Sequence, residues 1–142
     1  MNNIAFVSRW DVYPTFIKIT IPPVTNAQGV WILLAGSTNP MQTKFSNAAL
    51  VFSFSDGSST ILNLIPPMNY WALSGWGSAD YNYDTDSFIL PTIPPPTCQL
   101  GKNNRAMVYY QTIKPNTTLV QVSLEALSLE IVVGILGISL IG

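Results

Sequence analysis

Charged side chains are scarce in this sequence of 142 residues. Six Lys and Arg stand against seven Asp and Glu, so that 9% of the residues are charged, where soluble domains average about 25%. Six scattered cations in a chain of net charge −1 cannot neutralise a run of phosphates, which argues against a nucleic-acid partner. Low charge also leaves copies of the chain with little mutual repulsion, and near-neutral, apolar proteins tend to associate.

Histidine is absent, and cysteine occurs once, at Cys98. The chain therefore cannot build a Ser-His or Cys-His nucleophile or a His-ligated metal site. Cys98 has no histidine to activate it and no second cysteine to pair with in the chain, so we interpret it as an inert thiol. The sequence also lacks Gly-x-Ser-x-Gly, Walker, dinucleotide-binding and Cys-x-x-Cys motifs. These absences predict a protein that is not an enzyme.

Long apolar runs are missing as well. Residues 57–79 are uncharged but are interrupted by prolines and asparagines, and the apolar run 131–142 has only 12 residues. Neither can cross about 30 Å of hydrocarbon as a helix, so we expect no transmembrane segment. The first ten residues lack the basic and apolar regions of a secretory signal.

The chain does contain abundant apolar residues, which make up 48% of it. Disorder is excluded by this content, and a domain of this length buries enough surface to need neither a disulfide nor a metal. Short apolar or alternating runs bounded by turn residues predict about eight strands and no secure helix. We expect residues 1–142 to form one all-β domain, a single β-sandwich or jelly roll, with a long proline-rich loop excursion at 66–104.

The clearest local pattern is a hairpin around Ser55-Asp56-Gly57-Ser58. Alternating residues flank this segment, and Asp-Gly between such runs favours a type I′ turn. Other expected strands cover residues 16–20, 29–35, 87–90, 105–112 and 119–125.

The last segment, residues 128–140, has two interpretations. Leu124, Leu127, Ile131, Ile135 and Ile138 have helical spacing, which would fit a helix over 124–138. However, the segment is rich in β-branched residues and is interrupted by two glycines, which favours a strand. Apolar terminal strands of this kind invite pairing with another chain.

An acidic cluster, Asp80-Tyr81-Asn82-Tyr83-Asp84-Thr85-Asp86, is the one concentrated polar feature. Oxygens at alternate positions are typical of calcium loops, which makes Asp80, Asn82, Asp84 and Asp86 candidate calcium ligands. The sixth position is threonine where such loops need glycine, and the twelfth is Pro91 where a bidentate glutamate belongs. The alternative interpretation is a solvated, turn-forming loop without a cofactor.

Aromatic residues cluster beside these acids. Flat, amphipathic rings on a loop can stack on sugars or anchor a protein interface, although they can also fold inward and hold the loop down. The candidates for stacking are Tyr70, Trp71, Trp76, Tyr81 and Tyr83. Elsewhere, we expect the aromatic residues of 10–14 to pack inward, and Asn116-Thr117-Thr118 is a glycosylation sequon with Asn116 as the acceptor.

Several runs also occur in a characteristic order, among them Ser8-Arg9-Trp10-Asp11-Val12-Tyr13-Pro14, residues 33–42 (LLAGSTNPMQ), Asp56-Gly57-Ser58, Pro67-Met68-Asn69-Tyr70 and residues 127–137. Together they resemble the C-terminal β-sandwich domain of an uncharacterised family of large bacterial glycoside-hydrolase-like proteins. The resemblance implies a non-catalytic, carbohydrate-associated accessory domain with a jelly-roll-like sandwich and an extracellular or cell-surface location. This chain departs from that domain in a longer loop before Asp80, and we expect it to function without a catalytic domain before it.

Two functions follow from these observations. The first is a structural subunit that covers its apolar surface with copies of itself, as an oligomer or a filament, with terminal-strand exchange as one route. The second is a module that binds polysaccharide or docks an enzyme to it. Low charge and apolar terminal segments favour the first function, and the family resemblance favours the second.

Overall fold

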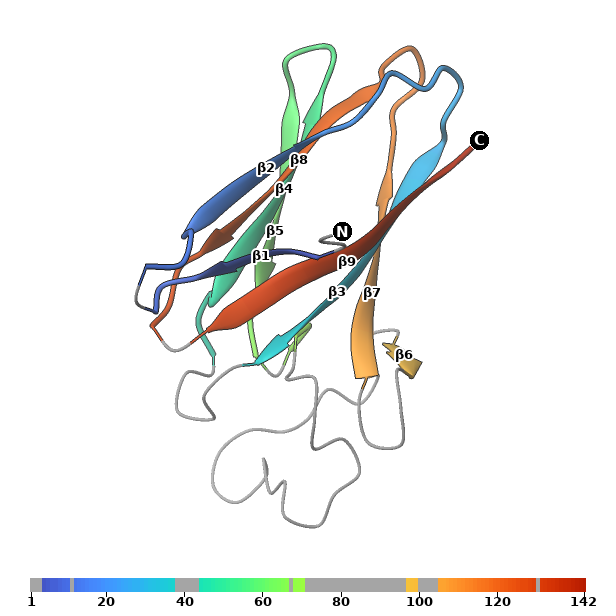
Figure 1. Ribbon diagram of the computed structural model, residues 1–142. Coiled ribbons are helices and arrows are strands. Elements are labelled where there is room, and N and C mark those ends of the chain that lie inside the picture. Colours follow the sequence, from blue (N-terminus) through green and yellow to red (C-terminus); the bar gives the residue numbers. More distant parts are fainter. Residues whose placement is uncertain are drawn as a thin grey trace.

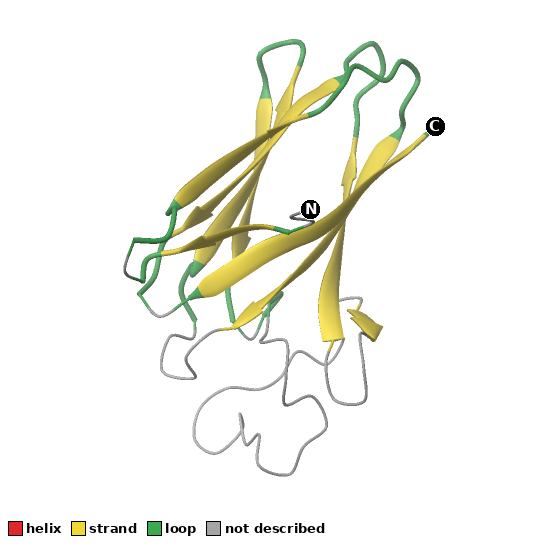
Figure 2. Ribbon diagram, in the orientation of Figure 1, coloured by secondary structure: helices red, strands yellow, loops and turns green. Residues whose placement is uncertain are grey.

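A computed structural model describes residues 4–10, 12–37, 44–66, 68–70, 97–99, 105–129 and 131–142, with only the backbone at 97–99 and 105. These residues form nine strands and no helix, which confirms the all-β prediction (Figures 1 and 2). The strands are β1 (Ala5–Ser8), β2 (Phe16–Thr20), β3 (Gly29–Ser37), β4 (Ala48–Phe54), β5 (Ser59–Leu64), β6 (Thr97–Gln99), β7 (Arg105–Thr112), β8 (Leu119–Ala126) and β9 (Val132–Ile141).

The strands build two antiparallel sheets that pack face to face (Figure 1). One sheet has five strands in the order β1-β9-β3-β7-β6, and the other has four in the order β2-β8-β4-β5. Apart from the short β6 and the β4–β5 hairpin, consecutive strands alternate between the two sheets, as in a jelly roll. The predicted β-sandwich is therefore confirmed. The expected strand at 87–90 lies outside the described residues, and β6 was not predicted.

The core fills the space between the sheets because alternate residues of each strand point inward. Val30, Ile32 and Leu34 of β3 face Leu50 and Phe52 of β4, all of them buried. Burying each such side chain contributes about 1.5–3 kcal/mol. This core explains how the chain folds with no disulfide among the described residues.

The predicted hairpin is present, but its turn is of a different type. Phe54 N–H donates to Ser58 O at 2.9 Å, so the loop has three residues, Ser55 to Gly57. Gly57 N–H closes the turn on Phe54 O, and Gly57 has φ +84° while Asp56 does not have a positive φ. A type I′ turn needs positive φ at both central residues, so that prediction is wrong. The geometry is that of a three-residue loop with glycine in the left-handed position.

Asp56 fixes this turn from its side chain. Its Oδ1 accepts hydrogen bonds from the hydroxyl (2.5 Å) and the backbone N–H (2.9 Å) of Ser58. These bonds, first the one from the hydroxyl, lower the pKa of the Asp56 carboxyl, and Lys114 in the neighbouring turn lowers it further.

The C-terminal segment is a strand, as predicted, and starts at Val132 rather than Ser128. It contains a β-bulge, because Leu33 pairs with Gly137 and Leu34 pairs with Ile135, which leaves Leu136 without an opposite residue. Val133 and Ile135 face the core before the bulge, and Ile138 and Leu140 face it afterwards. The change from odd to even positions explains the spacing of three between Ile135 and Ile138, which is one part of the helix-like pattern in the sequence.

Candidate interaction surface

The outer face of the five-stranded sheet is apolar. Residues that alternate with the buried ones on β1, β3, β7 and β9 must point away from the core. They are Phe6 on β1, Trp31, Leu33 and Ala35 on β3, Val108 and Tyr110 on β7, and Gly134, Gly137 and Ser139 on β9. We call these nine residues the apolar face. None of them is charged.

One end of the apolar face is formed by an aromatic pair. Trp31 and Tyr110 lie opposite each other on β3 and β7, with ring centroids 4.8 Å apart and an interplanar angle of 48°. Both remain partly open to solvent, at 38% and 47% exposure. Tyr110 also covers Gly29, where an added Cβ would overlap its ring. The pair therefore presents a fixed aromatic surface rather than two free side chains.

The opposite end of the apolar face lies at the edge strand β1. Phe6 pairs with Gly134, and the Phe6 ring meets the ring of Tyr13 edge to face, with 5.4 Å between centroids and an angle of 63°. Between the two aromatic pairs, β9 contributes Gly137 and Ser139 on this face. A Cβ at Gly137 would make only an ordinary contact, 3.8 Å from Leu33 Cβ. Small residues thus leave the middle of the apolar face open to a partner.

The outer face of the four-stranded sheet is different in kind. Its outward positions include Phe16 and Ile61, but most are polar and two are charged. The polar members are Lys18, Thr20, Ser53, Ser59, Asn63, Gln121, Ser123 and Glu125. A contiguous apolar face on only one sheet is typical of an interaction surface.

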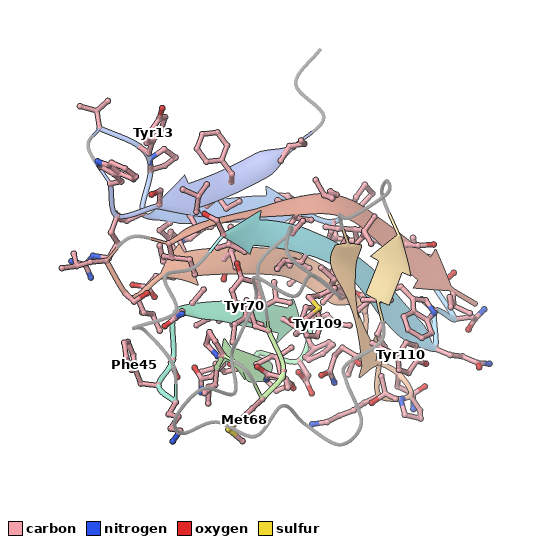
Figure 3. All side chains as sticks on the ribbon, turned by 90° about the horizontal axis from the view of Figure 1, so that it is seen from below. Tyr13, Phe45, Met68, Tyr70, Tyr109 and Tyr110 are labelled. Atoms are coloured by element: carbon pink, nitrogen blue, oxygen red, sulfur yellow. The ribbon has the colours of Figure 1, made fainter. Side chains whose placement is uncertain are left out.

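The β1–β2 connection carries further exposed apolar side chains beside Phe6. Trp10 is 66% exposed, so the expectation that the aromatic residues of this segment pack inward is wrong for it, and Val12 is exposed as well. Tyr13, labelled in Figure 3, is half exposed and packs against Phe6. Its backbone is nevertheless held in place, because Ser8 N–H donates to Pro14 O at 2.8 Å and Ser8 Oγ donates to Ile131 O at 2.7 Å. Hydrogen bonds of Ser8 therefore fix the two ends of this connection, while the side chains of Trp10 and Val12 are exposed to solvent.

The predicted stacking residues are located only in part. Tyr70 is fully buried between the sheets (Figure 3), so it offers no ring for stacking. It packs against Gly36, where an added Cβ would lie 2.6 Å from Tyr70 Oη. The glycine leaves the space that the phenol fills. The other four candidates, Trp71, Trp76, Tyr81 and Tyr83, lie outside the described residues.

Tyr70 has a buried neighbour, Tyr109 (Figure 3). Tyr109 Oη donates a hydrogen bond to the backbone carbonyl of Asn69 at 2.6 Å. Burial raises the pKa of the Tyr109 phenol well above its ordinary value, and the nearby Tyr70 raises it further. The two phenols belong to the core, and at neutral pH the neutral Tyr109 hydroxyl serves as a hydrogen-bond donor.

The candidate calcium ligands Asp80, Asn82, Asp84 and Asp86 also lie outside the described residues. Among the residues that the structure does describe, no three His, Cys, Asp or Glu side chains gather as a metal site. Asn116, the sequon asparagine, is exposed in the β7–β8 turn with φ +64°. Cys98 lies on the edge strand β6.

A cleft of about 620 Å³ opens at the end of the sandwich where the β2–β3 and β7–β8 connections meet. Its walls are residues 25–28 and 113–118, and Lys114 is the one ionisable side chain among them. The remaining polar groups are amides and hydroxyls. This lining contains no acid–base pair and no aromatic platform for a sugar.

Sequence reasoning did not single out Trp31 or Tyr110. A signal for Trp31 was present, because both alternating sets of β3, Val30-Ile32-Leu34 and Trp31-Leu33-Ala35, are apolar. Such a strand is covered on both faces in most folds. Here one face is covered by the second sheet, and the other is the apolar face.

Comparison with known proteins identifies no relative. No family model, no curated protein and no solved structure matches the chain. The resemblance to a glycoside-hydrolase-like accessory domain thus stays a prediction. The described part of the chain contains no apolar helix of membrane-spanning length.

Proposed function

We propose that this protein is a non-catalytic structural subunit that associates with copies of itself through the apolar face. The observation that supports the proposal is the difference between the two sheets. One outer face carries Lys18, Glu125 and a majority of polar residues, and the other presents aromatic and aliphatic side chains without a charge.

A second copy is a suitable occupant because the apolar face is complementary to itself. Two copies can meet there about a two-fold axis without bringing like charges together. Each 100 Å² of apolar surface removed from water contributes about 2.5 kcal/mol before the cost of association is subtracted. Fixed aromatic residues such as Trp31 and Tyr110 are the usual centres of such interfaces.

The fold is compatible with this function. Jelly-roll sandwiches occur in shells assembled from many copies of one chain and also in sugar-binding domains, so the fold leaves both classes open. Polysaccharide binding remains the alternative that the sequence predicted. Of its five candidate stacking residues, only Tyr70 lies among the described residues, and it is buried.

The experiment places one charge in the middle of the apolar face. Gly137→Lys removes no existing side chain, and the Cβ it adds has room. We expect sedimentation velocity to show concentration-dependent oligomers for the wild type and at least tenfold weaker association for Gly137→Lys. Ile61→Lys, a matched change on the other sheet, should leave association unchanged. A wild type that stays monomeric at high concentration, or equal association of all three proteins, would overturn the proposal.

A further inference from the structure

Strand β9 is paired along its whole length on one edge only. On the β3 side its partners run from Val132 to Ile141, whereas β1 pairs only with Val132 to Ile135. Within the described residues, no strand pairs with 136–141 on the β1 side. In the described part of the chain, the five-stranded sheet therefore has an open edge along the second half of its longest strand.

The backbone groups at this open edge can be identified from the ladder. Ile113 N–H donates to Gln28 O, so the even-numbered residues of β3 bond toward β7 and the odd-numbered ones toward β9. Their partners on β9 are Ser139 and Ile141, and the Ile141 carbonyl does accept a hydrogen bond on that side, from Gln28 N–H. By alternation, the N–H and C=O groups of Ile138 and Leu140 point toward the open edge.

Three other strands with open edges, β2, β5 and β7, carry a charge or a side-chain hydrogen bond there. Lys18 stands in the middle of β2. The side-chain amide of Asn69 donates to the Asn63 carbonyl on β5, and that of Gln111 donates to the Thr112 carbonyl on β7. Natural edge strands use such devices to prevent pairing with other chains. Residues 136–141 contain neither a charge nor a proline.

Side chains at this edge would also gain from a partner. Ile138 and Leu140 of β9, together with Ile17 and Ile19 of β2, pack against the core but are only partly buried. Ile138 and Leu140 lie beyond Ile135, the last residue of β9 that pairs with β1. An additional strand beside 136–141 would cover them as β1 covers the first half of β9.

From these observations we propose that β9 of one copy pairs antiparallel with β9 of a second copy, about a two-fold axis at Ser139. In this register Ile138 lies opposite Leu140 of the second copy, and the reverse, so each of these two pairs exchanges both N–H···O bonds. The bulge residue Leu136 stays outside the pairing. This inference specifies a contact for the self-association proposed above and rests on that proposal.

The pairing would join two five-stranded sheets into one continuous sheet of ten strands. The apolar faces of both copies would then form a single surface on one side of it. Edge pairing and face packing can therefore operate together, the first making a dimer and the second stacking dimers.

A cysteine at the two-fold axis tests the register. Ser139 is exposed on the outer face, and in the proposed pairing its Cα lies about 4.5 Å from that of its counterpart, within the range that a disulfide spans. The test protein is Cys98→Ser with Ser139→Cys, oxidised at low concentration and examined on a non-reducing gel. We expect at least ten times more disulfide-linked dimer than in the control, Cys98→Ser with Ile141→Cys. In the proposed register the control cysteines lie about 13 Å apart along the strand.

The outcomes distinguish this inference from the proposed function. Oligomers in sedimentation with no excess of disulfide at position 139 would overturn the β9 pairing and leave self-association intact. A wild type that sediments as a monomer, without disulfide formation at position 139, would overturn both. A disulfide at position 139 in a protein whose association is insensitive to Gly137→Lys would support the β9 pairing and contradict the role of the apolar face.

Discussion

The Tyr110 ring of β7 lies directly over Gly29 of β3, in the space that a side chain at position 29 would need. Trp31, two residues after Gly29 on β3, packs against the side of this ring. The absence of one side chain thus determines how the largest exposed aromatic pair of the five-stranded sheet is placed.

We therefore expect Gly29→Ala to destabilise the fold by about 1 kcal/mol or less, below the usual cost of overpacking a core, because the far end of the Tyr110 ring is exposed and can move. The new Cβ would overlap the Tyr110 ring and force it outward. Urea unfolding monitored by tryptophan fluorescence would measure the change. In the Tyr110→Ala background the same substitution should cost clearly less, and an equal cost in both backgrounds would contradict the overlap.

Substitutions of Gly57 in the hairpin should also destabilise the fold, but for a different reason. Gly57 has open space around it, so only its φ of +84° resists a substitution. Gly57→Ala is expected to lower the free energy of unfolding by about 1 kcal/mol, and Gly57→Asn by less, because asparagine tolerates left-handed backbone. If the two variants had the same stability, backbone strain would not be the cause.

The stability of the fold should depend on pH at high pH because of the buried phenol of Tyr109. Its pKa in the folded state is raised above the unfolded value near 10, so between the two values the folded state binds more protons than the unfolded state. The resulting stability is complete below about pH 10 and is lost as the pH rises above it. Thermal unfolding between pH 8 and 11 should show a steeper decline for the wild type than for Tyr109→Phe.

Tyr109→Phe itself also has a cost at neutral pH. It removes the hydrogen bond to the Asn69 carbonyl, which is worth about 0.5–1.5 kcal/mol. If the two pH profiles were parallel, the raised pKa of Tyr109 would be refuted.

Self-association through an uncharged face should respond to salt as a hydrophobic contact does. Screening by sodium chloride, which weakens charge-based contacts, should change the dissociation constant less than about threefold between 0.05 and 0.5 M. Ammonium sulfate should strengthen association, because sulfate is excluded from protein surface. Sedimentation at both salts checks this, and dissociation by sodium chloride would indicate charged contacts instead.

Much of the fold could be predicted because strand patterns are local. The strands over 16–20 and 105–112 have the predicted bounds, since alternation and flanking turn residues identify a half-buried strand without reference to its neighbours. The hairpin was located for the same reason. The predicted turn type was wrong, because the turn type depends on which pair of residues closes the loop. Here that pair is Phe54 and Ser58, and the Asp-Gly sequence alone does not specify it.

The surface could not be predicted, because exposure depends on which sheets cover which faces. Trp31 and Val30 are neighbours in a uniformly apolar run, and only the order of the strands places one outside and the other inside. Tyr70, in contrast, is buried although it was a candidate for stacking. Its loop composition suggested an exposed ring, whereas Gly36, far away in the sequence, provides the space that buries it.

The bulge at Leu136 has a consequence for how this strand can vary in length. Because one unpaired residue separates the two halves of β9, inward side chains fall on odd positions in the first half and on even positions in the second. Deleting Leu136 would remove the bulge and restore strict alternation, and it would leave Ile138 and Leu140 inward and Ser139 outward. A single-residue deletion there would therefore shorten the strand without exchanging its inside and outside, whereas a residue inserted without a bulge would exchange them for half the strand.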